Sequence, residues 1–179
     1  MAVKKKKAVK TKTPAKNLRM HETSNDLPKA TRVRMVELLN ARLADSVVIH
    51  MQMKQAHWNV KGPNFIGLHK LFDEIYEATE GYVDMIAERA VMLGGIVHGT
   101  AKAAVASSKL PDYPDGISTG VAHVEAVTKA LAAYGSEIRD AIDKADDLQD
   151  ADTADLFTAV SRGVDKWLWF VEAHIQATS

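Results

Sequence analysis

Apolar residues recur at spacings of three and four over most of the chain, which is the period of an amphipathic helix. Two long stretches of this kind, 27–59 and 65–93, are followed by two more, 117–148 and 153–177. The region between the second and third stretches contains a short alanine-rich helical segment, 100–107, and the motif LPDYPDG, typical of a long crossover connection. The chain is therefore predicted to be all-α, a four-helix bundle with a short extra helix in the crossover loop.

Residues with capping or helix-breaking chemistry mark the expected ends of these helices. Asp26 or Thr31 can begin the first helix, and Asn64 can cap the second. Gly94-Gly95 can end the second helix. Asp152 is a suitable N-cap for the last helix, because its short carboxylate can accept a hydrogen bond from the first turn.

The second helix carries two pairs of residues that can bind a metal. His69 and Asp73 are four residues apart, as are Asp84 and Glu88, so each pair projects from one side of the helix. At 100° per residue all four share a face, but about 22 Å along the helix axis separates the two pairs. One chain cannot bring both pairs to one ion. They are therefore either two half-sites or ordinary solvated helix surface.

If a two-fold axis sets this helix antiparallel to its copy, the two separated pairs of one helix meet those of the other. In that register His69 of one subunit faces Glu88 of the other, and Asp73 faces Asp84, because the two pairs of residue numbers have the same sum. A preceding helix packed antiparallel would also fold His57 back toward His69. The candidate ligand set is thus His57, His69 and Asp73 of one subunit with Asp84 and Glu88 of another.

Mixed imidazole and carboxylate ligands suit iron or manganese and tolerate other divalent metals such as zinc or cobalt. The chain has no cysteine, which excludes both disulfides and a thiolate metal site. His50 lies seven residues before His57, about 20° away around the helix. It belongs either to the outer environment of the site or to a core or interface.

Three segments carry a resemblance to a known family: QAHWNVKGPNFIGLHKLFDE (55–74), DMIAERAVMLGG (84–95) and DTADLFTAVSRGVDKWLWFVEAHI (152–175). They resemble the Dps family, the ferritin-like DNA-binding proteins from starved cells, and the resemblance extends from about residue 26 to the end. Ferritin bundles that hold two metals inside one subunit use a Glu-x-x-His motif on two helices, which is absent here. Carried over by position, the family's ferroxidase ligands fall on His57, His69, Asp73, Asp84 and Glu88.

The resemblance implies a ferritin-like fold that assembles into a hollow homo-dodecamer. The implied function is a ferroxidase and iron-storage protein. Such a protein oxidises Fe(II), preferably with hydrogen peroxide, retains Fe(III) in its shell and protects DNA from oxidative damage.

The N-terminal sequence MAVKKKKAVKTKTPAKNLRM is strongly basic. It carries seven lysines and one arginine without an acidic residue, although the whole chain has a net charge of zero. We expect residues 1–25 to be a disordered arm before a ferritin-like domain at 26–179. The arm alone is a solubilising tail or, in a eukaryotic protein, a nuclear address. On a dodecamer it would bind DNA phosphates without sequence preference through Lys4, Lys5, Lys6, Lys7, Lys10, Lys12 and Lys16.

Residues 143–155, between the last two helices, include six aspartates. Locally this segment is a solvated acidic loop. Gathered around a three-fold axis, its carboxylates would focus negative potential and draw cations inward. In the Dps family this region lines a three-fold pore for iron, and the pore candidates here are Asp146, Asp150, Asp152 and Asp155.

The sequence also indicates where in the cell the protein acts. No apolar run approaches the roughly 20 residues that cross a bilayer, and the N-terminus lacks the apolar core of a secretory signal. We expect a cytoplasmic protein of the bacterial nucleoid, with no membrane partner. Two alternatives stay open beside an iron-oxidising store. One is a nucleoid-compacting DNA-binding shell with a non-catalytic metal site, and the other is a helical module that binds a partner protein.

Overall fold

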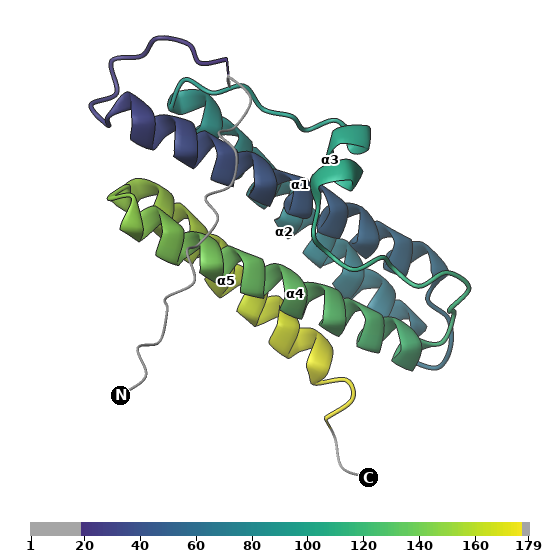
Figure 1. Ribbon diagram of the computed structural model, residues 1–179. Helices are drawn as coiled ribbons and strands as arrows, with labels where there is room; N and C mark the ends of the chain where they lie inside the picture. Colours follow the sequence, from purple (N-terminus) through teal and green to yellow (C-terminus); the bar gives the residue numbers. More distant parts are fainter. Residues whose placement is uncertain (1–18, 177–179) are drawn as a thin grey trace, which may run out of the picture.

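A computed structural model describes residues 19–176, which form five α-helices and no strand (Figure 1). The two antiparallel hairpins α1–α2 and α4–α5 pack against each other as a four-helix bundle. This confirms the predicted all-α bundle with a short helix in its crossover loop. The helices are α1 (Lys29–Asn59), α2 (Phe65–Met92), α3 (Ala101–Ser107), α4 (Gly120–Asp147) and α5 (Ala151–Glu172).

The inward faces of the four long helices form one hydrophobic core. Leu39 on α1, Phe72 on α2, Leu131 on α4 and Phe157 on α5 are all fully buried. Burial of a large apolar side chain contributes roughly 1.5 to 3 kcal/mol, so packing of these faces is what holds the hairpins together. Among the described residues, no helix combines the length and apolar character that a bilayer crossing requires.

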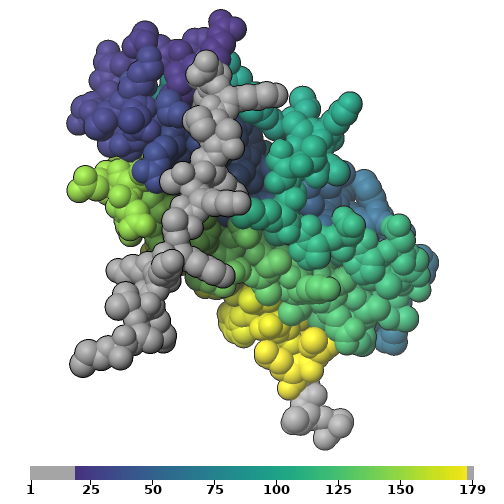
Figure 2. All heavy atoms as spheres, in the orientation of Figure 1, coloured from purple at the N-terminus to yellow at the C-terminus, as the bar shows by residue number. Residues whose placement is uncertain are grey.

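The crossover segment between α2 and α4 runs the length of the bundle, because α2 and α4 begin at the same end. Figure 2 shows it spread over α1 and α4. Buried α1 side chains hold it in place. Asp45 Oδ1 accepts hydrogen bonds from the Ser108 hydroxyl and the Lys109 N–H, both at 2.8 Å, and Gln52 donates to the Pro111 carbonyl at 2.8 Å.

Two of the predicted helix starts are wrong. The first helix begins at Lys29 with Pro28 in the N-cap position, so neither Asp26 nor Thr31 begins it. The last helix begins at Ala151, and its N-cap is Asp150, whose carboxylate accepts from the Thr153 N–H at 3.1 Å.

The other helix ends agree more closely with the sequence. Asn64 occupies the N-cap position of α2, although its side chain accepts no capping hydrogen bond. α2 ends at Met92, directly before Leu93 and Gly94, and Gly94 has a positive φ of 85° that favours glycine. The last helix ends at Glu172 and not near Ala177.

The described part of the N-terminal segment lies against the end of α2. The His21 N–H donates to the Gly94 carbonyl at 2.7 Å, and the Asn25 side chain accepts from the Leu27 N–H at 3.0 Å. The predicted boundary at residue 25 therefore falls inside a segment that is bonded to the bundle. The seven lysines of the predicted arm lie outside the described residues.

Candidate metal centre

His57 and His69 face each other where α1 ends and α2 begins. The two Nδ1 atoms bond reciprocally, His57 Nδ1 to the His69 carbonyl and His69 Nδ1 to the His57 carbonyl, both at 2.8 Å. The rings stack with centroids 3.7 Å apart and an interplanar angle of 22°. The structure thus brings these two predicted ligands together across the tight turn between the helices.

The reciprocal bonds determine which nitrogen of each ring is free. A carbonyl oxygen only accepts, so both Nδ1 atoms carry the proton and both Nε2 lone pairs remain free. Metal-binding histidines are commonly held in this way, with the other ring nitrogen donating to a carbonyl. His57 and His69 are therefore oriented to bind a cation through Nε2.

Asp73 lies one turn after His69 and adds a carboxylate to this group. Its Oδ1 is 3.8 Å from His57 Nδ1 and forms an ion pair with the Lys54 ammonium group. The hydrogen bond from Lys54 and the positive charge of its ammonium group lower the pKa of Asp73. Asp73 is therefore a carboxylate at neutral pH.

Lys54, which pairs with the Asp73 carboxylate, is absent from the set of residues predicted from the sequence. It lies three residues before His57, so both side chains emerge from the same side of α1. The three-residue spacing places this lysine near the histidine, but such a spacing is too common on helices to identify a functional pair.

Asp84 and Glu88 lie farther along α2 and are exposed to solvent. Neither side chain makes a hydrogen bond or an ion pair with another described residue. Within residues 19–176, no three histidine or acidic side chains converge so that they could hold a metal ion. One chain alone therefore presents the predicted ligands as two separate groups.

Exposed apolar side chains border both groups. Trp58, next to His57, is 59% exposed, and Phe65 lies with its ring centre 5.0 Å from that of His69. Met51 on α1 and Met85 on α2 are also exposed. Contiguous apolar surface rimmed by polar residues is typical of protein–protein interfaces. These exposed apolar residues lie on the two helices that carry the predicted ligands.

His50 belongs to the packing between α1 and α2. Its Nδ1 lies 3.1 Å from both the Tyr76 carbonyl and the Thr79 hydroxyl, and its ring stacks on Tyr76 with centroids 3.9 Å apart. Burial lowers the pKa of His50, so it is neutral at pH 7. It lies next to Lys54 along the helix and does not reach the histidine pair.

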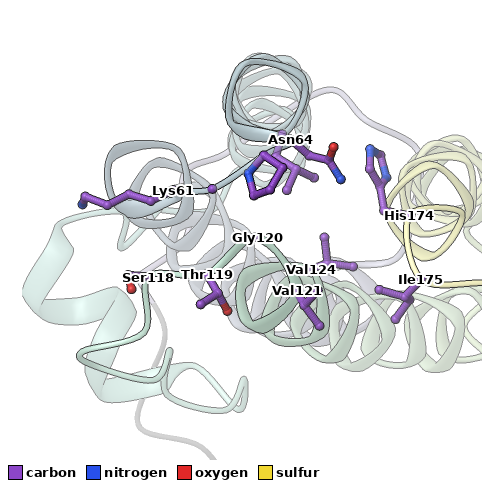
Figure 3. A pocket seen from close by; sticks show the side chains of 12 residues that line it. Lys61, Asn64, Ser118, Thr119, Gly120, Val121, Val124, His174 and Ile175 are labelled. Atoms are coloured by element: carbon purple, nitrogen blue, oxygen red, sulfur yellow. The ribbon is translucent and has the colours of Figure 1, made fainter.

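A cavity of about 560 Å³ lies beside the turn that joins α1 and α2 (Figure 3). It is bounded by the N-termini of α2 and α4 and by the residues after α5, with Lys61 on one side and His174 on the other. Its remaining lining is largely apolar, including Leu68, Val124 and Ile175. None of the described residues that line it carries a carboxylate.

The aspartates between α4 and α5 differ sharply in exposure. Asp146, Asp152 and Asp155 are exposed. Asp150 is only 2% exposed, and it caps α5 while forming an ion pair with Arg89 at 2.7 Å. The prediction that Asp150 lines a pore is therefore wrong, because its carboxylate is already bonded inside its own chain.

Comparisons with known proteins show the family and the fold of the chain. The family described as ferritin-like domain matches residues 36–179. The DNA protection during starvation protein of Agrobacterium fabrum is 41% identical over 162 residues, covering 90% of this chain and 100% of that relative. The solved structure of Mycobacterium smegmatis Dps has a TM-score of 0.83 at 33% identity and covers 88% of this chain and 96% of its own. DpsA14 from Streptomyces coelicolor has a TM-score of 0.85 at 31% identity, with coverages of 90% and 95%.

Proposed function

Because this chain belongs to the Dps family of ferritin-like proteins, we propose that it is a ferroxidase and iron-storage protein. It assembles as a hollow homo-dodecamer, oxidises Fe(II), preferably with hydrogen peroxide, and retains Fe(III) in the shell. The single observation that carries this proposal is the reciprocal pairing of His57 and His69, which leaves both Nε2 lone pairs free, with the Asp73 carboxylate 3.8 Å from His57 Nδ1. Other divalent metals such as zinc or cobalt suit the same donors.

The second half of the site comes from a neighbouring subunit. Asp84 and Glu88 share the exposed face of α2 with the first half and have no partner among the described residues of their own chain. An antiparallel contact of α2 with its copy brings Glu88 to His69 and Asp84 to Asp73, which gives two equivalent sites per dimer. The exposed Trp58 and Met85 support an interface on this face.

The two kinds of ligand have different roles in the reaction. The histidines suit Fe(II), while the hard, anionic carboxylates favour the higher charge of Fe(III). Two ferrous ions each give one electron to hydrogen peroxide, which takes up two protons and leaves as two water molecules. Because the site is divided between subunits, oxidation depends on assembly.

Iron reaches the interior through the acidic segment between α4 and α5. The exposed carboxylates of Asp146, Asp152 and Asp155 would gather around a three-fold axis and concentrate cations there. We omit Asp150 from this pore because Arg89 and the α5 N-terminus hold it inside the chain.

The lysine-rich N-terminal segment binds DNA. Its charge, repeated over the subunits of a shell, makes a multivalent ligand for phosphates that is indifferent to sequence and weakened by salt. The Agrobacterium fabrum relative is a DNA protection during starvation protein, which supports this part of the proposal. The protein would then act in the cytoplasm at the bacterial nucleoid, where it consumes iron and peroxide together close to DNA.

A second candidate is a nucleoid-compacting shell whose metal site is not catalytic. The observation in its favour is the Lys54–Asp73 ion pair, because the ammonium group competes with iron for the carboxylate.

Ferrous oxidation separates the two candidates. Absorbance would be followed anaerobically after hydrogen peroxide is added to the assembled protein and to the Asp84→Ala/Glu88→Ala variant. Fast oxidation that the variant loses supports the ferroxidase. Equal, slow rates in both proteins would leave the DNA-compacting shell as the function.

A further inference from the structure

Arg89 ties the last turns of α2 to the start of α5. Its Nε donates to the Thr153 hydroxyl at 2.9 Å, and one terminal nitrogen donates to Asp150 Oδ1 at 2.7 Å. The other terminal nitrogen lies 3.8 Å from Asp152 Oδ2. The side chain is only 11% exposed, so the guanidinium is held from several directions inside the bundle.

The acceptors of Arg89 are themselves fixed. Asp150 accepts from the Thr153 N–H at 3.1 Å through Oδ1 and from the Thr153 hydroxyl at 2.6 Å through Oδ2. Both residues are buried. Arg89, Asp150 and Thr153 therefore close a ring of hydrogen bonds in which each member orients the next.

This ring holds the stretch of α2 that carries the second half of the proposed site. Glu88 precedes Arg89 directly, and Asp84 lies one turn earlier on the same side as Glu88. Both carboxylates are exposed and lack a partner among the described residues of their own chain. Their directions thus depend on the rotation of α2 about its axis, which the bonds of Arg89 set together with the buried Ile86 and Ala90.

We propose that Arg89 is a positioning residue for Glu88 that aims this carboxylate across the subunit interface at the histidine pair. The inference rests on the proposed function, since it concerns the same site. The charge of Arg89 is engaged by the buried Asp150, so its effect on Glu88 is geometric and does not neutralise the ligand. A misdirected carboxylate weakens metal binding first, because the histidine pair across the interface stays in place.

The test compares Arg89→Met, Arg89→Lys and Glu88→Gln with the wild type, all as assembled protein. Two quantities are measured: the KM and kcat of Fe(II) oxidation with hydrogen peroxide, and the visible absorption spectrum of bound Co(II). Arg139→Met is the matched control, because Arg139 forms an exposed ion pair with Asp165 between α4 and α5. Thermal unfolding of each variant reports the purely structural effect.

The expected result is a KM for Fe(II) that rises about tenfold in Arg89→Met, with a much smaller change in kcat. Its Co(II) spectrum should move toward that of Glu88→Gln. Arg89→Lys should restore part of the affinity, since an ammonium group can still reach Asp150, and Arg139→Met should behave like the wild type. An unchanged KM and Co(II) spectrum in Arg89→Met overturn the inference.

A second variant covers the case in which Arg89→Met does not assemble. Thr153→Val removes the hydroxyl that accepts from Arg89 Nε and donates to Asp150 Oδ2, and it keeps the shape of the side chain. It should raise the KM for Fe(II) by a smaller factor, and an unchanged KM and Co(II) spectrum then overturn the inference.

Co(II) binding needs no oxidation. A wild type that binds Co(II) but oxidises no iron therefore contradicts the proposed function and leaves the role of Arg89 to be decided by the spectra.

Discussion

The ammonium group of Lys54 rests on the carboxylate of Asp73, so a fixed positive charge already occupies one side of the proposed iron site. The same ammonium group lies 4.3 Å from the centre of the Tyr76 ring, which holds it there from the other side. A cation that binds Asp73 must displace this group or share the carboxylate with it. We therefore expect Lys54 to limit the affinity of the proposed site for iron.

Replacing Lys54 by methionine should strengthen metal binding. The substitution removes a like charge from the neighbourhood of the incoming ion and keeps the length of the apolar stem. We expect the affinity for Co(II), measured by anaerobic calorimetry on the assembled protein, to rise by about tenfold. Lys129→Met removes an exposed lysine from α4 and should leave the affinity unchanged. Weaker binding in Lys54→Met would mean that the lysine orients Asp73 and does not compete for it.

The stability of the protein should depend on His50 between about pH 7 and pH 5. Burial lowers the pKa of His50 below its ordinary value of 6.5, although the Tyr76 carbonyl and the Glu80 charge oppose this. As the pH falls through 6.5, the unfolded chain takes up the proton before the folded chain, so folding loses stability.

His50→Asn should flatten this dependence. Its amide can still donate to the Tyr76 carbonyl, but it does not titrate. The free energy of unfolding, obtained from urea titrations across this pH range, should fall less steeply than in the wild type. His98 is exposed, and His98→Asn should keep the wild-type slope. Equal slopes in His50→Asn and the wild type would contradict the assignment.

Gly163 on α5 is required by its neighbour Tyr82 on α2. A Cβ atom at this position would lie 2.0 Å from the Tyr82 hydroxyl oxygen, so the tyrosine or the helix must move. Gly163→Ala should lower the free energy of unfolding by about 1 to 3 kcal/mol. Gly67→Ala on α2 is the control, because nothing lies within 4 Å of the place that its methyl group would take, and alanine favours a helix. Chemical denaturation of both variants would show the difference, and equal stability would exclude the clash.

Deleting residues 1–17 should separate DNA binding from iron chemistry. The segment carries seven lysines, so its loss should abolish DNA retardation in gels at moderate salt and leave the rate of ferrous oxidation unchanged. Unchanged DNA binding by the deleted protein would assign the contact to another surface.

The periodicity of the sequence predicted the helices well where packing alone decides. The predicted end of the second helix at Leu93 is one residue from its end at Met92, and Gly94 follows with a positive φ. The start of the first helix was missed because Pro28, which makes no side-chain capping bond, precedes it, and the start of the last helix was missed because a contact with another helix holds its cap. Asp150, not Asp152, caps α5, and its carboxylate is held by Arg89 on another helix.

In the candidate site, too, helical spacing predicted some features, and contacts between helices decide the others. Helical spacing indicated which of His57, His69 and Asp73 lie together, and the structure places them so. The spacing could not reveal the reciprocal Nδ1 bonds or the Lys54–Asp73 pair, because both depend on how closely α1 and α2 approach each other. The division of the ligands between two subunits remains a prediction.

Mixing two inactive variants tests that division most directly. His57→Ala/His69→Ala removes one half of every site, and Asp84→Ala/Glu88→Ala removes the other half. Each protein alone should fail to oxidise iron rapidly. When equal amounts are dissociated and reassembled together, random pairing should restore about one quarter of the wild-type sites, and peroxide-dependent ferrous oxidation should recover to that extent. No recovery in correctly assembled mixed shells would contradict a site built from two subunits.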